Sequence, residues 1–206
     1  MDAIDLLKKD HAKVATLFQR FNDGGGLTGV VKRLTGNAAS PRQRRSAAEQ
    51  ICRELDVHAS IEETTFYPAL RALRDQRLDE MLDEAQREHG SIKDGVQESR
   101  AVFADDERLR TAMATLQQCV DHHVREEENE MFPLVEERMP ENERAGLGRE
   151  LAARRRAHAA PAPRPKKTTK RPAARTRPGG RRRVRKTTTK VTKARTRAKA
   201  RAGRRR

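Results

Sequence analysis

Two segments of the chain carry the same arrangement of histidine, glutamate and proline. In residues 58–68 and 123–133, a histidine is followed by a glutamate four positions later and by a proline ten positions later. The pairs are His58 with Glu62 and His123 with Glu127. On a helix, side chains at positions i and i+4 are neighbours on one face, with Cβ atoms about 5–6 Å apart. An imidazole beside a carboxylate is half of a metal site, and two such helices could complete the site across a bundle core.

The elements that would position these pairs are amphipathic helices, because apolar residues recur at steps of three or four. The helix that carries His58 has a strong start signal: Ser40 and Gln43 can form a capping box, and Pro41 suits the first helical position. Short connections favour antiparallel neighbours, so the sequence predicts an all-α, up-down-up-down four-helix bundle. The expected helices span residues 2–22, 40–73, 78–103 and 105–137, with a short helix at 141–153 and a glycine-rich loop at 24–39.

Each long helix carries one histidine on its apolar seam, and two of the helices add a glutamate one turn later. A single histidine on an apolar face is most often a core residue, but one on each of four helices favours a metal site. A charged carboxylate in such a seam costs on the order of several kcal/mol unless it is paired or bound to a cation. The candidate ligands are His11, His58, Glu62, His89, His123 and Glu127.

The number and type of these ligands indicate which metal they suit. Four imidazoles and two carboxylates exceed the four ligands of a tetrahedral zinc site. They suit two ions bridged by the carboxylates, and iron fits the mixed nitrogen and oxygen set. Ferritin-like di-iron proteins place a glutamate three residues before a histidine. No histidine of this chain has that neighbour, which excludes a ferritin-like centre.

The combined pattern resembles the hemerythrin HHE cation-binding domain over about residues 1–150. The resemblance implies a non-haem di-iron centre with an oxo or hydroxo bridge and an open position for O2 or a related small molecule. It also implies that Glu62 and Glu127 bridge the irons and that the four histidines are terminal ligands. The motifs that carry the resemblance are Lys9-Asp10-His11, His58-Ala59-Ser60-Ile61-Glu62-Glu63, Glu88-His89 and His123-Val124-Arg125-Glu126-Glu127.

The third helix departs from the oxygen-carrying members of that family, which have two histidines four residues apart there. Here Ala85 and Lys93 stand four residues before and after His89. We therefore do not expect reversible O2 transport. An extra open position, or a substitute ligand such as Glu63, Glu126 or water, favours redox chemistry, peroxide or NO reactivity, or sensing.

Four other residues near the motifs receive structural interpretations. We interpret His122 as a surface residue, since the match to the first motif selects His123. Tyr67 could lie near the site, but we expect it to serve mainly in packing. Cys52 and Cys119 give no disulfide framework and are expected to be small buried hydrophobes.

The C-terminal region has a different composition. Residues 154–206 contain 24 Lys and Arg and no Asp or Glu, whereas residues 1–153 carry a formal charge of −8. We place the bundle in residues 1–150 and a disordered tail, which resembles those of linker histones, in residues 151–206. We expect the tail to bind DNA by non-specific, salt-dependent neutralisation of phosphates. The alternatives are RNA or another polyanion, or contact with the acidic bundle itself. The candidate nucleic-acid-binding residues are Lys166, Lys167, Lys170, Arg171, Arg181, Arg182, Arg183, Arg185, Lys186 and Lys190.

These features lead to three functional hypotheses. The first is a di-iron protein that binds or senses O2, NO or peroxide and is anchored to DNA by its tail. The second is a di-iron redox enzyme, peroxidase-like or NO-handling, and the third is a structural nucleoid protein with a metal-stabilised bundle. The sequence shows no transmembrane segment and no signal segment, so we expect a cytoplasmic, nucleoid-associated protein with no membrane partner.

Overall fold

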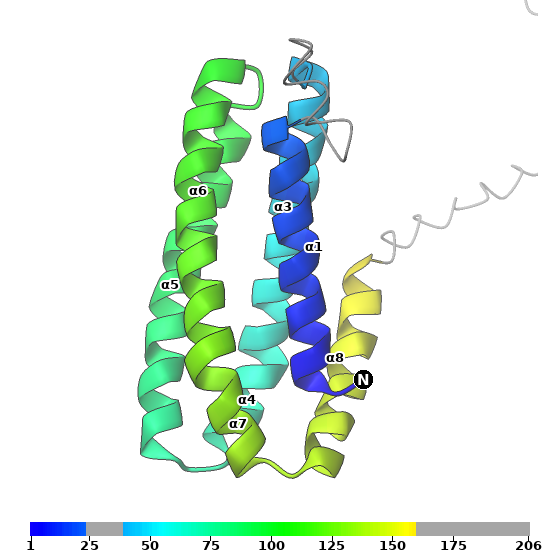
Figure 1. Cartoon of the computed structure of the whole chain (residues 1–206), viewed down its shortest axis with the longest axis vertical. Coiled ribbons are helices and arrows are strands. Elements are labelled where there is room, and N and C mark those ends of the chain that lie inside the picture. The colour runs from blue at the N-terminus through cyan, green and yellow to red at the C-terminus, as the bar shows by residue number, and fades with distance from the viewer. Residues whose placement is uncertain (24–38, 160–206) are drawn as a thin grey trace, which may run out of the picture. The chain divides into compact units, whose positions relative to one another are not determined.

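The computed structural model describes residues 1–23 and 39–159, and within them every regular element is helical, as predicted. Figure 1 shows successive long helices running in alternate directions, with the last helix alongside α1. The helices are α1 (Ala3–Asp23), α3 (Pro41–Ile61), η1 (Glu62–Phe66), α4 (Tyr67–Arg71), α5 (Gln76–Ala101), α6 (Asp106–Glu126), η2 (Glu127–Met131), α7 (Phe132–Arg138) and α8 (Glu141–Ala159). No described helix has the length and apolar character needed to cross a membrane.

Side-chain caps fix where the helices begin. The capping box predicted for α3 is present: Ser40 Oγ accepts from the N–H of Gln43 at 3.3 Å, and Gln43 Oε1 accepts from the N–H of Ser40 at 2.9 Å. At the start of α1, Asp2 Oδ1 accepts a hydrogen bond from the N–H of Asp5, and Asp5 Oδ2 accepts one from the N–H of Asp2. Asp75 accepts from the N–H of Leu78 at the start of α5. These caps satisfy amide groups that have no partner within the helix.

Both helices with the repeated motif contain a π-helical turn; the sequence predicts a bend or weakening of the first helix at Pro68, but not this wider turn. The turns η1 and η2 begin at Glu62 and Glu127, and each precedes a proline, Pro68 or Pro133. Proline lacks an N–H group and its ring clashes with the carbonyl group four residues earlier. The wider turn relieves this conflict, and the N–H of Tyr67 instead bonds the carbonyl of Glu62, five residues earlier.

The core consists of two apolar clusters, one toward each end of the bundle. In each of the four long helices, the seam histidine falls between residues of one cluster and residues of the other. A polar layer therefore crosses the bundle at one level, with apolar packing on both sides. The flanking pairs are Leu7 and Val14, Leu55 and Ile61, Ala85 and Ile92, and Val120 and Met131.

Helix α8 packs against α1 and α3 and is longer than the 141–153 predicted. Leu147 and Leu151 are buried in the cluster that contains Leu7 and Met131, and Arg144 Nε donates to Asp2 Oδ2 at 3.2 Å. Residue 150, the predicted domain boundary, lies within this helix, and the boundary stays a prediction. The glycine-rich segment 24–38 and the basic residues 160–206 lie outside the described residues, so their predicted structure is untested.

Candidate metal centre

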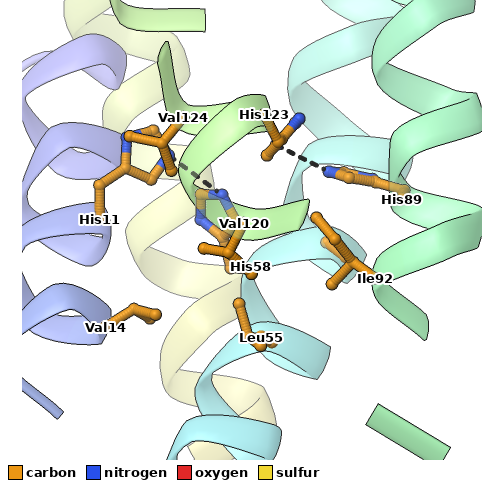
Figure 2. Close-up of a pocket in the computed structure, with 10 residues that line it drawn as sticks. His11, Val14, Leu55, His58, His89, Ile92, Val120, His123 and Val124 are labelled. Carbon is orange, nitrogen blue, oxygen red and sulfur yellow. Dashed lines mark hydrogen bonds between the residues drawn. The ribbon is translucent and has the colours of Figure 1, made fainter. Parts of the chain in front are cut away.

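The structure brings the six predicted ligands together in the polar layer of the bundle. Each long helix contributes one histidine, and all six side chains are buried. Figure 2 shows the imidazoles in two pairs: His11 Nε2 lies 3.2 Å from His58 Nε2, and His89 Nε2 lies 3.2 Å from His123 Nε2. The Nε2 atoms thus converge from four helices on one small volume.

The two glutamates lie between the imidazoles. Glu62 Oε2 is 3.1 Å from His58 Nε2 and 3.2 Å from His89 Nε2. Glu127 Oε2 is 3.3 Å from His11 Nε2 and 3.6 Å from His123 Nε2. The potential ligand atoms form two groups that share Glu62, and within each group all atoms lie within 4.8 Å of one another. The groups are His11, His58, Glu62 and Glu127, and Glu62, His89 and His123.

The buried carboxylate oxygens fit a cation. Both oxygens of Glu62, together with Glu127 Oε2, have no hydrogen-bond partner, although neither side chain is more than 1% exposed. The imidazoles are near these oxygens without the alignment of a hydrogen bond. A buried carboxylate without a partner is strongly destabilising. The donor set of nitrogen and oxygen atoms is thus suited to a cation.

Carboxylates outside the layer orient three of the histidines. Each accepts from an imidazole Nδ1–H, which fixes the tautomer and leaves the Nε2 lone pair directed inward. Sequence reasoning missed this role, although the Glu-Glu doublets at 62–63 and 127–128 signal it: the second glutamate of each doublet reaches a histidine on another helix. The contacts are His11 to Glu128 at 2.8 Å, His89 to Glu63 at 2.9 Å and His123 to Glu88 at 2.9 Å.

Tyr67 lies in the site rather than serving only in packing. Its hydroxyl donates to Glu127 Oε1 at 3.0 Å and lies 3.3 Å from His89 Nε2. Its ring stacks on the His89 imidazole, with centroids 5.5 Å apart. Phe132, at the matching position of the second motif, stacks on His11 at 5.9 Å. The aromatic residue nine positions after each motif histidine is the sequence signal for this arrangement.

Comparison with known families identifies the domain that carries this cluster. Residues 2–135 match the family model described as the hemerythrin HHE cation-binding domain. The chain belongs to this family. No curated protein and no solved structure matches the chain. The His and Glu cluster of this HHE domain could hold a metal, and the resemblance inferred from the motifs is confirmed over these residues.

Burial and charge shift the pKa values of the central residues of the HHE domain in opposite directions. Burial, followed by the negative charge of Glu127, raises the pKa of Glu62 well above its ordinary value. Burial and the charge of His11 lower the pKa of His58 well below its ordinary value. For Glu127, burial alone would raise the pKa, but the nearby positive charges of His123 and His11 outweigh burial and lower it. Two neighbouring carboxylates cannot both ionise in this setting without added positive charge, which a metal ion supplies.

A small apolar cavity adjoins the histidines of the HHE domain. Its volume is about 10 Å³, and the four imidazoles form part of its wall. Figure 2 shows Val14, Leu55 and Ile92, which belong to the same apolar cluster, beside the imidazoles. A cavity of roughly 10–15 Å³ on this measure holds about one water-sized molecule. The aliphatic lining residues are Val14, Leu55, Ala59, Ile92, Val120 and Val124.

The remaining residues singled out in the sequence lie around the centre. Lys93, four residues after His89 on α5, bonds Glu63 at 2.6 Å and so supports the partner of His89. Glu63 is therefore positioned to orient His89. His122 is largely exposed, as predicted, and lies 3.2 Å from Glu126. Cys52 is buried as expected, whereas Cys119 is only partly buried.

Proposed function

We propose that this HHE-domain protein binds two non-haem iron ions in the polar layer and responds there to O2, NO or peroxide. His11 and His58 would hold one ion, and His89 and His123 the other. Glu62 and Glu127 would bridge them, since each carboxylate approaches imidazoles from both pairs. When bound, a di-iron centre supplies redox chemistry toward small oxygen and nitrogen species.

The observation that carries the small-ligand proposal is the apolar cavity against the four imidazoles. Its size admits a molecule about as small as water and excludes larger substrates. Aliphatic walls formed by Val14, Ile92, Val120 and their neighbours keep bulk water away from the centre. An apolar chamber beside a polar layer is an arrangement that favours a weakly hydrated ligand such as O2 or NO over water.

The third helix supports a responsive centre rather than an oxygen carrier. Ala85 and Lys93 stand four residues before and after His89, where oxygen-carrying members of the family would have a second histidine, and Lys93 bonds Glu63. Helix α5 therefore offers His89 alone to the centre. Tyr67 stands beside His89, with its hydroxyl group 3.3 Å from His89 Nε2.

Tyr67 also supports a second candidate, a peroxidase-like or NO-handling enzyme. Its phenol holds a proton at Oη, within hydrogen-bond distance of Glu127 Oε1. Burial, followed by the charges of Glu127 and Glu62, raises the pKa of Tyr67 well above its ordinary value. The proton therefore stays on the phenol at neutral pH and is available as a hydrogen-bond donor at the centre.

For the basic tail we propose non-specific binding to DNA, with RNA as the alternative polyanion. The candidate residues between Lys166 and Lys190 lie outside the described part of the structure, so composition alone supports this part. A run of Lys and Arg without acidic residues releases counterions from phosphates on binding, whatever the base sequence. Association with the nucleoid and a cytoplasmic location belong to the same proposal.

The small-ligand proposal can be tested by filling the cavity. In Val120→Leu the added methylene group enters the chamber, so the absorption change on adding NO, O2 or peroxide should slow about tenfold or more while the iron content stays constant. Val57→Leu, on a partly buried residue that does not line the cavity, is the control. Equal rates in all three proteins would contradict the cavity as the ligand site. Turnover of peroxide or NO under the same conditions separates the enzyme from the sensor.

A further inference from the structure

A cleft rich in carboxylates lies between α5 and η2. Its volume is about 250 Å³, and no Lys or Arg lines it. Glu127 is shared between this cleft and the proposed iron centre, because its other contacts are to His11 and His123. The cleft therefore connects the outside of the bundle with one of the bridging carboxylates. The six carboxylates in its wall are Glu80, Glu84, Glu88, Glu126, Glu127 and Glu130.

Outside the proposed iron centre, one oxygen in this wall is buried and has no hydrogen-bond partner. It is Glu88 Oε1, whose side chain is 9% exposed. Glu127 Oε2 instead faces His11 and His123 in the proposed iron centre. A buried carboxylate oxygen without a donor carries the full desolvation penalty, and several carboxylates in one cleft repel one another. A cation in the cleft removes both penalties.

His122 completes a ligand set at the edge of the cleft. Its Nε2 lies 3.1 Å from Glu88 Oε1 and 3.2 Å from Glu126 Oε1. The potential ligand atoms of the three residues all lie within 4.8 Å of one another. None of the three forms an ion pair with Lys or Arg in the described part of the chain, whereas Glu84 in the same cleft pairs with Arg87. One imidazole with two carboxylates is a donor set that first-row divalent cations accept.

We propose that Glu88, His122 and Glu126 form an outer binding site for a divalent cation, and that iron(II) passes from it through the cleft to Glu127. Glu88 links the two sites, since Oε1 faces the outer site while Oε2 accepts from His123 Nδ1 at 2.9 Å. The clustered negative charge raises the local cation concentration and so speeds capture. The transit step rests on the proposed iron centre, but binding at the outer site does not.

The outer site is tested by titrating the metal-free, full-length protein with Mn²⁺. Binding is measured as the decrease in the electron paramagnetic resonance signal of free Mn²⁺. His122→Ala/Glu126→Gln should bind one Mn²⁺ fewer per chain than the unmodified protein. Glu150→Gln/His158→Ala, which makes the same changes of residue type on α8, should bind the full number. Equal Mn²⁺ binding by all three proteins would overturn the outer site.

The transit step is tested by the rate of anaerobic Fe²⁺ uptake by the same three proteins. The cleft variant should load about tenfold more slowly, with unchanged final iron content, because electrostatic capture changes the rate and not the inner ligands. Unchanged uptake rates would overturn the route through the cleft. If no protein retains iron at its centre while the cleft variant still loses one Mn²⁺, the iron centre fails and the outer site stands.

Discussion

Tyr67 donates a hydrogen bond to Glu127 Oε1 across 3.0 Å, which joins the first motif helix to the second at the metal layer. The bond depends on the π-helical turn η1, which begins at Glu62 and ends immediately before Tyr67. Glu62 and Tyr67, at the start of the turn and just after it, are both buried inside the bundle. The turn thus lets one short segment supply a candidate ligand and the hydroxyl that holds the other carboxylate.

Replacing Tyr67 with Phe should remove this bond while keeping the stacked ring. The buried Glu127 Oε1 then loses its donor, so the free energy of unfolding should fall by about 1–3 kcal/mol. Iron content should stay constant, and the visible absorption of the loaded protein should shift, because Glu127 is a proposed bridging ligand. Denaturant unfolding and absorption spectroscopy measure the two effects. A variant with unchanged stability and spectrum would show that the hydroxyl has no role at the centre.

The outer carboxylates should control iron affinity. In Glu128→Gln, the acceptor for His11 Nδ1 becomes neutral, and the imidazole is less firmly oriented. Loss of such a partner typically lowers metal affinity by about 10–100-fold, which competition with a chelator measures. The exposed Glu136→Gln on α7 is the matched control and should retain full affinity. The interpretation of Glu128 as an orienting partner is wrong if both variants release iron equally.

A salt bridge at the far end of the bundle should make stability depend on pH. The hydrogen bond from Arg44, aided by its charge, lowers the pKa of Asp106 below its ordinary 3.8, and Arg44 itself is buried. Stabilisation by this bridge is present above the ordinary pKa and is lost as pH falls through the lower folded pKa. Asp106→Asn should therefore destabilise the metal-free protein at about pH 7, by roughly 1–3 kcal/mol.

The difference between Asp106→Asn and the unmodified protein should shrink toward zero once Asp106 is protonated, at a pH well below about 3.9. Urea unfolding at several pH values measures it. A difference that is constant with pH would contradict the ionic account of the contact.

The packing of α8 on α1 should be sensitive to one glycine. A Cβ added at Gly148 would lie 2.6 Å from the backbone carbon of Asp2, closer than side chains tolerate. Gly148→Ala should therefore lower the free energy of unfolding by about 1–3 kcal/mol. Gly146→Ala, whose Cβ would meet only the end of the Arg149 side chain at 3.8 Å, should be neutral or stabilising. Thermal unfolding of both variants checks the contrast, which similar shifts would refute.

The basic tail should account for retention on DNA. A chain that ends after Ala159 keeps every described helix and should lose binding at moderate salt. For the full-length protein, the logarithm of the binding constant should fall linearly with the logarithm of salt concentration, with little dependence on base sequence. Retention of the truncated chain on DNA at the same salt concentration would exclude the tail as the anchor.

The sequence predicted those parts of the centre that depend on contacts within one helix. His58 with Glu62 and His123 with Glu127 are i and i+4 pairs, and the seam positions of His11 and His89 follow from helical periodicity. These features need no knowledge of how the helices pack. The all-helical fold and the family were predictable for the same reason.

Contacts that depend on packing between helices could not be predicted from the sequence. The contacts of Glu128 with His11 and of Tyr67 with Glu127 join residues 117 and 60 positions apart. The π-helical turns reflect a competition between proline geometry and core packing, which a helical periodicity does not resolve. The length of α8 was underestimated, because its last turns extend beyond its buried leucines.

The central claim is the di-iron centre, and metal analysis of the purified full-length protein tests it most directly. The account predicts about two irons per chain, with an absorption band of a bridged ferric pair, and loss of both in His58→Ala/His123→Ala. That variant removes one proposed ligand from each ion, while Glu62 and Glu127 stay in place. A protein that binds no iron, or a double variant that keeps the full iron content and spectrum, would contradict it.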